Sequence, residues 1–241
     1  MQQLWIKGKA MKILENSKLI ERNKKIAQYT LYVSLALLVF GFIWSIRNTD
    51  PDKAMVGWLI LLPSYFLVQI SIYMANKWGK SPRPDEIVIQ SLKGLNDEYT
   101  FYNYTTPVPH LLVGPQGAWI LNPYHQKGVI SFNSDKQRYQ QKGGAGVIGK
   151  YFGQEGLPNV LRENENLKKD LQKYYEKRNI NERINPEVIN VFYSEVVELD
   201  GENFPVPCIK ADKLKTFVRK ESKNRELTPE ELSELRRLLT E

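Results

Sequence analysis

The chain carries two uncharged apolar runs near its start, residues 29–46 (YTLYVSLALLVFGFIWSI) and residues 54–75 (AMVGWLILLPSYFLVQISIYMA). At about 1.5 Å per residue, helices of 18 and 22 residues span roughly 27 and 33 Å, which matches a hydrocarbon core of about 30 Å. Only seven residues separate the runs, enough for a tight turn that returns the chain through the bilayer. The sequence therefore predicts a transmembrane helical hairpin, with the rest of the chain on one face of the membrane.

A buried helical hairpin in a soluble protein is the alternative, but buried helices rarely lack charge over such a length. Aromatic side chains lie in both runs where the membrane–water interface favours them. They are Tyr29, Tyr32 and Trp44 for the first run, and Trp58, Tyr73 and Trp78 in and just after the second. The pattern favours two membrane spans.

The formal net charge of +7 belongs entirely to the membrane segment. Residues 1–80 hold 11 Lys/Arg and 4 Asp/Glu, and the totals of 34 and 27 therefore leave 23 of each for residues 81–241. Basic residues are denser on the two outer flanks of the hairpin than in its loop, so both termini and the soluble domain are expected to be cytoplasmic. The predicted location is the cytoplasmic (inner) membrane, where residues 1–28 form a basic arm able to lie on anionic lipid headgroups.

Residues 77–84 (KWGKSPRP) form a short hinge, and residues 85–241 have the composition of one globular domain. Periodicity and turn signals predict helices at 85–95, 163–177, 213–220 and after Thr228, and strands at 99–104, 111–113, 118–121, 129–132, 188–193 and 206–209. This order predicts an α/β fold in which helices flank a mixed sheet. A single cysteine, Cys208, excludes an internal disulfide and a zinc site built from cysteines.

One stretch of this domain, residues 108–124 (VPHLLVGPQGAWILNPY) with Gly128-Val-Ile130 after it, resembles the nuclease-related domain, or NERD. Members of that family typically read hydrophobic-Asp-His, an apolar strand, Gly-Pro-x-Gly, a second apolar strand, Glu-x-Lys and Gly-x-Ile. The resemblance extends over about residues 84–240 and implies a restriction-endonuclease-like fold. Membrane spans ahead of such a domain fit the family.

The chain departs from the family motif at its three catalytic positions. Pro109 stands where the family has its metal-binding aspartate, Asn122 where it has the glutamate, and Tyr124 where it has the lysine. In such a site the two carboxylates hold Mg²⁺, which activates water, and the lysine helps to position that water. Glu86 and His110 remain at family-like positions, but one carboxylate and one imidazole do not make this site. The resemblance implies a pseudoenzyme without a catalytic metal or other cofactor, which serves as a binding or assembly module.

Two other functions stay open. One is a divergent Mg²⁺-dependent nuclease, acting on DNA or RNA, which recruits carboxylates from elsewhere, for example Glu86 with Asp97, Glu98 or Asp135. The other is a structural hairpin protein that oligomerises through its membrane helices. The expected partners are membrane lipid and either a second copy of the chain or another protein.

A basic stretch interleaved with aromatic residues follows the NERD-like motif. Its basic residues are Lys127, Lys136, Arg138, Lys142 and Lys150, and its aromatic residues include Phe132 and Tyr139. Such a stretch is able to grip a nucleic-acid backbone or to face anionic lipid. In a domain of zero net charge, a solvated face is the favoured interpretation.

The topology is tested by a cysteine placed at Thr49, in the turn between the two spans, with Cys208 replaced by serine. We expect an impermeant thiol reagent to label this cysteine only from the outside, because the less basic loop is the translocated one. A cysteine at Lys9 serves as the control and should label only from the cytoplasm. Labelling of Thr49→Cys from the cytoplasmic side would reject the predicted topology.

Overall fold

The computed structural model of the chain describes residues 10–48, 50–146, 149, 156–180, 184–201, 203–224 and 227–240. These residues form two compact units. The hairpin unit contains the described residues between Lys18 and Arg83. The sheet unit contains the described residues up to Ser17 and those from Pro84 onwards. The hairpin unit is therefore an insertion into the chain of the sheet unit.

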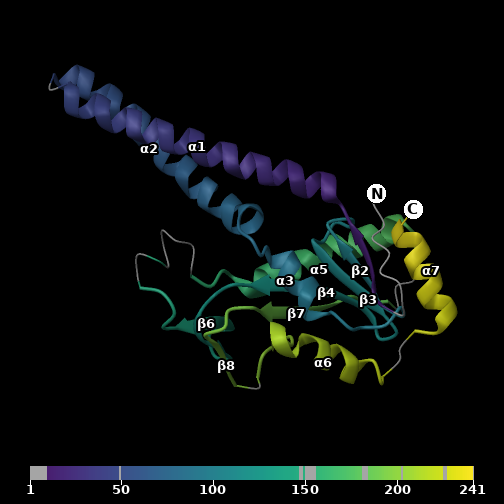
Figure 1. The fold of residues 1–241 in the computed structure, drawn as a ribbon. Coiled ribbons are helices and arrows are strands. Elements are labelled where there is room, and N and C mark those ends of the chain that lie inside the picture. The colour runs from purple at the N-terminus through teal and green to yellow at the C-terminus, as the bar shows by residue number, and fades with distance from the viewer. Residues whose placement is uncertain are drawn as a thin grey trace. The chain divides into compact units, whose positions relative to one another are not determined.

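The hairpin unit consists of two long helices, α1 (Ser17–Arg47) and α2 (Pro51–Met74), and a π-helical turn, η1 (Ala75–Gly79). The two long helices run antiparallel (Figure 1). Pro51 opens α2, and the Asp50 carboxylate accepts a hydrogen bond of 3.0 Å from the backbone N–H of Asp52, as at a capped helix start. The indole Nε1 of Trp44 donates to the carbonyl of Lys53 at 3.0 Å and ties the two helices together at the turn.

Both helices are long and apolar enough to cross a membrane. Their most apolar windows have mean hydropathies of 1.9 and 1.8, and only 17% of each window is buried. Large side chains such as Tyr32, Trp58 and Leu59 are more than 60% exposed. A core hairpin of a soluble protein would bury most of this surface, so its exposure favours lipid as the surrounding solvent.

Small buried side chains recur along one side of each long helix. They recur every seven residues as Ala27, Ser34 and Gly41 on α1 and as Gly57, Ser64 and Ser71 on α2, and all six are buried. A seven-residue spacing keeps a stripe on one side of a helix, and small residues allow two backbones to approach closely. A Cβ atom at Gly41 would lie 3.0 Å from Ile60 Cγ2, and one at Gly57 would lie 3.2 Å from Ser45 Cβ.

The sheet unit is built on a six-stranded sheet, which is mixed as the sequence predicts but includes an unpredicted strand, β1. Its order is β1 (Lys12–Glu15), β2 (Thr100–Asn103), β3 (His110–Gly114), β4 (Gly117–Tyr124), β7 (Glu187–Phe192) and β9 (Cys208–Lys210). Strands β2, β3 and β4 are antiparallel neighbours, while β1 joins β2, β7 joins β4 and β9 joins β7 in parallel. The strands predicted at 111–113 and 118–121 are confirmed, and they form the β-hairpin of β3 and β4. At its turn Gly114 pairs with Gly117, whose φ of +114° suits glycine.

Helices cover both faces of this sheet (Figure 1). On one face α3 (Pro84–Ser91) and α6 (Ala211–Glu221) pack against Leu112 and Trp119. On the other, α5 (Val160–Lys177) and α7 (Pro229–Thr240) pack against Leu111 and Ile120. Neighbouring residues of β3 and β4 thus enter opposite cores, as the period of two in a strand requires. Central strands buried on both faces explain the continuous apolar runs in the sequence.

A second, three-stranded sheet has the order β6 (Arg138–Lys142), β5 (Gly128–Asn133) and β8 (Val197–Asp200). Strands β5 and β6 are antiparallel, and β5 and β8 are parallel. Ile130 and Val197 of this sheet share a small core with Tyr124 and Phe192 of the main sheet. The sequence predicts β5 but not β6 or β8, because the RYQQK and VELD segments lack a strong apolar pattern.

Several element boundaries differ from those expected. The helix expected over 85–95 ends at Ser91, and the chain then turns through Gly94, whose φ is +93°. The strand expected over 206–209 is β9, which begins at Cys208. At the start of α7, Thr228 Oγ1 accepts from the Glu231 N–H at 3.2 Å and Glu231 Oε2 accepts from the Thr228 N–H at 2.8 Å. This reciprocal pair is a capping box, and it begins the helix that the sequence predicts after Thr228.

The N-terminal segment has a role that the sequence does not reveal. Residues 12–15 lie in the basic stretch assigned to a cytoplasmic arm, yet they form β1 at the edge of the main sheet. The backbone N–H of Lys12 donates to the Tyr99 carbonyl at 3.0 Å, and that of Asn16 donates to the Asn103 carbonyl at 3.0 Å. Backbone hydrogen bonds at both ends of β1 thus join the chain ahead of α1 to the sheet.

Replacing Gly41 or Gly57 with leucine should separate α1 from α2, because the added side chain meets the facing helix at the seam of small residues. Overpacking at such a site costs about 1–3 kcal/mol. The measurement is unfolding of the full chain in detergent micelles, with hydrogen exchange or chemical labelling at positions of the hairpin unit as the readout. Leu59→Ala, at a position 68% exposed, is the matched control and should change stability by less than the seam variants. Equal effects at seam and exposed positions would contradict the helix contact.

Candidate functional site

The candidate site is a polar cluster at the carboxyl end of β4, beneath the first turns of α5. Asn122 Nδ2 donates to the Tyr124 hydroxyl oxygen at 2.7 Å and to Asn164 Oδ1 at 3.1 Å. The Tyr124 hydroxyl in turn donates to Glu163 Oε2 at 2.8 Å. Asn122 and Tyr124 of β4 are therefore joined to each other and to α5 by hydrogen bonds.

Burial sets the protonation state of this cluster. Tyr124 is 3% exposed, and its ring stacks on Phe192 with centroids 5.2 Å apart. Burial raises the pKa of Tyr124 well above that of a free tyrosine, and the neighbouring Glu163 carboxylate raises it further. Tyr124 is thus a neutral hydrogen-bond donor at every physiological pH. Its hydrogen bond to Glu163 occupies one lone pair of that carboxylate.

The third motif position offers no ligand atom beyond its backbone. Pro109 lies directly before β3, and its carbonyl accepts a hydrogen bond of 2.7 Å from the Tyr104 N–H. Glu163 is the one carboxylate hydrogen-bonded within the Asn122–Tyr124 cluster. The sequence places Glu163 in a helix but gives no signal that this helix begins over β4, so Glu163 and Asn164 are missed as site residues.

His110 and Asp85, the residue before Glu86, belong to a different cluster, centred on Asn103. The Asn103 amide nitrogen donates to Glu15 Oε2 and to Asp85 Oδ2, each at 3.0 Å, and its oxygen lies 3.0 Å from His110 Nδ1. Asp85 and Asn103 are fully buried and His110 is 3% exposed. The sequence singles out Glu86, but the adjacent Asp85 is the buried carboxylate of α3. This cluster joins β1, β2, β3 and α3.

The carboxylates considered for a relocated metal site lie in separate places. Glu86 is on α3, Asp97 and Glu98 lie in the turn before β2, and Asp135 lies in the turn between β5 and β6. Asn96 Nδ2 donates to Glu98 Oε2 at 2.9 Å. Within the described part of the chain, no group of three or more His, Cys, Asp or Glu side chains is placed to hold a metal ion.

The basic residues that follow the motif cluster around the second sheet. Arg138 and Lys142 lie on β6, Lys136 precedes it, and Lys127 precedes β5, all with exposed side chains. Lys150 lies outside the described residues. The structure also brings acidic residues of β8 into the same sheet, two strands away from β6. This juxtaposition is invisible in the sequence, because β6 and β8 are more than 50 residues apart.

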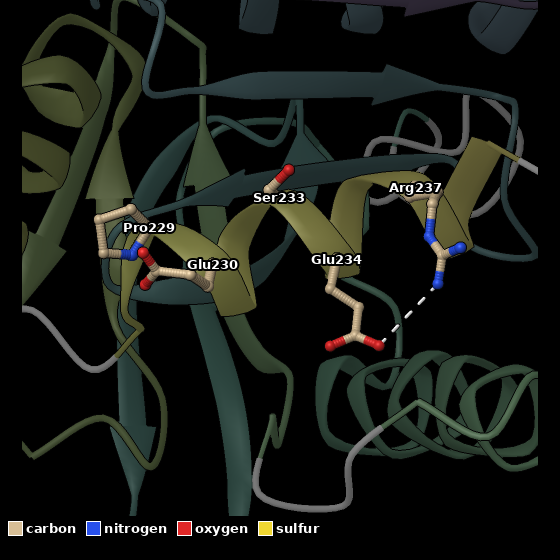
Figure 2. A pocket seen from close by; sticks show the side chains of 5 residues that line it. All are labelled: Pro229, Glu230, Ser233, Glu234 and Arg237. Carbon is tan, nitrogen blue, oxygen red and sulfur yellow. Dashed lines mark ion pairs between the residues drawn. The ribbon is translucent and has the colours of Figure 1, made fainter.

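A surface hollow of about 530 Å³ lies along α7 (Figure 2). It is lined by Pro229, Glu230, Ser233, Glu234 and Arg237. Arg237 and Glu234 form an ion pair at 4.0 Å, and both side chains are about two-thirds exposed. A hollow of exposed side chains on one helix lacks the converging buried polar groups of a binding site.

Comparison of the chain with protein-family models, with curated proteins and with solved structures finds no match in any of the three. The functional assignment therefore depends on the two buried polar clusters, the membrane helices and the charge pattern of the second sheet.

Replacing Tyr124 with phenylalanine removes one donor and one acceptor from the cluster around Glu163. We expect a loss of about 1–3 kcal/mol in the free energy of unfolding, since Glu163 and Asn122 each lose a partner in a low-dielectric setting. Tyr193→Phe is the control, because its hydroxyl makes no hydrogen bond to a described residue. Denaturant unfolding of the full chain in micelles compares the two, and equal losses would argue against the network.

Proposed function

We propose that this chain is a membrane-anchored, non-catalytic assembly module, and that its sheet unit is a restriction-endonuclease-like domain of the nuclease-related type. Its function is to hold a folded α/β domain at the cytoplasmic face of the membrane, where the domain binds another protein. The observation that carries the non-catalytic part is the closed hydrogen-bond network of Asn122, Tyr124 and Glu163.

The order of elements supports the proposed fold. The NERD-like motif occupies β3 and β4, with α3 and β2 before it and α5 and β7 after it. The motif turn between Gly114 and Gly117 joins two fully buried central strands, and β7 lies parallel beside β4. These are the positions that the resemblance assigns to the motif hairpin, the opening helix and the later core strand.

The chemistry of the motif positions supports the loss of catalysis. Mg²⁺ needs several hard oxygen ligands, and carboxylates supply them in hydrolytic sites. Asn122 contributes a neutral amide whose nitrogen already donates two hydrogen bonds, and Tyr124 is held neutral by burial. Pro109 contributes only a backbone carbonyl, which already accepts from Tyr104. Stabilising contacts thus occupy the place of a metal centre.

The connectivity supports the proposed anchoring. The hairpin unit leaves the sheet unit after Ser17 and returns to it at Pro84. A polar folded domain does not cross a bilayer, so a membrane insertion with both ends in one domain must cross an even number of times. Two spans fulfil this condition, and the Lys/Arg excess on the outer flanks favours the cytoplasmic side for the domain.

A cleavage assay tests the absence of catalysis. The full chain in lipid nanodiscs is incubated with DNA or RNA and Mg²⁺ or Mn²⁺, and we expect no cleavage above that of empty nanodiscs. The Glu86→Ala variant serves as the matched control, because Glu86 is the carboxylate retained at a family-like position. Metal-dependent cleavage by the unmodified chain that is abolished by EDTA and by Glu86→Ala would overturn the proposal in favour of a nuclease.

A further inference from the structure

The second sheet of the domain has a basic strand, an uncharged strand and an acidic strand side by side. Arg138 and Lys142 lie on β6, while Glu198 and Asp200 lie on β8, and all four side chains are exposed. Strand β5 lies between them and carries no charge. Within the described part of the chain, none of the four charged side chains takes part in an ion pair.

The charged side chains project from one face of this sheet. Ile130, Tyr139, Val197 and Leu199 belong to the small core or pack against it. Alternate residues of a strand point to opposite faces, so the intervening residues form the outer face. They are Arg138, Gln140 and Lys142 of β6, Val129, Ser131 and Asn133 of β5, and Glu198 and Asp200 of β8. The strand register places Lys142, Val129 and Glu198 in one row across the sheet.

This pattern is unsuited to a partner of uniform charge. Strands lie about 4.8 Å apart, so the basic and acidic strands are about 10 Å apart, close to a Debye length of about 8 Å at physiological ionic strength. A nucleic-acid backbone or an anionic membrane lying across the face would be attracted by the basic residues of β6 and repelled by the acidic residues of β8. The outer face fits a partner that carries the opposite alternation of charge.

We propose that the partner is a second copy of this chain, packed face to face through the outer faces of the two small sheets. A two-fold axis parallel to β5 reverses the order of the strands, so that β6 of each copy lies over β8 of the other. Lys142 then faces the partner's Glu198, and Gln140 faces the partner's Asp200. The interface is isologous, so the Lys142–Glu198 ion pair and the Gln140–Asp200 contact each form twice in a closed dimer.

The size of the face sets the conditions under which this dimer forms. Three strands of about six residues cover about 14 by 20 Å, or roughly 300 Å² per copy, against about 800 Å² for a standard interface. Such a dimer is weak in dilute solution, but confinement of both copies to one membrane raises their effective concentration. The inference therefore rests on the proposed anchoring function. Val196, 65% exposed directly before β8, adds apolar surface beside the face.

Disulfide formation across the two-fold axis reports the dimer. The full chain carrying Ser131→Cys and Cys208→Ser is reconstituted in vesicles of phosphatidylcholine, which offer no anionic headgroup. Because Ser131 lies on the central strand, the two copies bring this position close to itself, and mild oxidation should give a covalent dimer. Asp212→Cys in the same background, on an exposed position of α6, is the control and should crosslink at least tenfold less.

Charge reversal then tests complementarity. In the Ser131→Cys background, Arg138→Glu with Lys142→Glu makes both outer strands acidic, and Glu198→Lys with Asp200→Lys makes both basic. We expect each pair alone to reduce crosslinking by about tenfold or more, because like charges then face each other at both copies of the contact between positions 142 and 198. Mixing the two variants should restore crosslinking, and so should all four substitutions in one chain. Lys169→Glu with Lys173→Glu on α5 is the matched control and should leave crosslinking unchanged.

Three results would overturn the inference. The first is crosslinking of either reversed variant at the level of the parent. The second is failure of the mixture to restore crosslinking while both variants keep the parent's resistance to proteolysis. The third is binding of DNA or RNA that Arg138→Glu with Lys142→Glu abolishes and that Glu198→Lys with Asp200→Lys strengthens. This result would assign β6 to nucleic acid. The cleavage assay does not depend on the dimer, so loss of the dimer leaves the non-catalytic assignment in place.

Discussion

The attachment of both ends of the membrane hairpin to one sheet is the constraint on which the rest of this structure depends. Glu15 ends β1 two residues before α1 begins, and Asp85 lies in the first turn of α3, where the chain returns. Asn103 donates to both carboxylates and holds His110 with its oxygen. Breaking this cluster would leave polar groups buried without partners, which is costly. The cluster therefore holds the two points where the chain leaves and re-enters the sheet unit, next to Glu15 and Asp85, against the central strands.

The same logic applies to the hydrogen-bonded side chains at the end of β4. A catalytic metal centre keeps negative oxygens close together and leaves coordination positions open for water and substrate, which costs stability until the metal binds. Asn122, Tyr124 and Glu163 instead satisfy one another through a chain of short hydrogen bonds under α5. The site has the properties of a structural joint between β4 and α5.

Charge is distributed according to the two environments of the chain. The basic excess lies in residues 1–80, on either side of the two apolar helices. Residues 81–241 carry no net charge, but the second sheet within them separates the two signs by two strand spacings. A neutral domain with a local alternation of charge is suited to recognising a protein surface of matching alternation, which in this chain includes its own.

The sequence by itself determined the elements whose signals are local. Uninterrupted apolar length gives α1 and α2, the Gly114–Gly117 turn between apolar runs gives β3 and β4, and the Thr228–Glu231 capping box gives the start of α7. Only the tertiary structure decided where polar segments lie. The KILE, RYQQK and VELD strands have weak patterns of their own, and they become strands because a neighbouring strand offers unpaired backbone groups. The contacts of Glu163 with Tyr124 and of Asn103 with Glu15 and Asp85 join residues far apart in the chain, which no local pattern encodes.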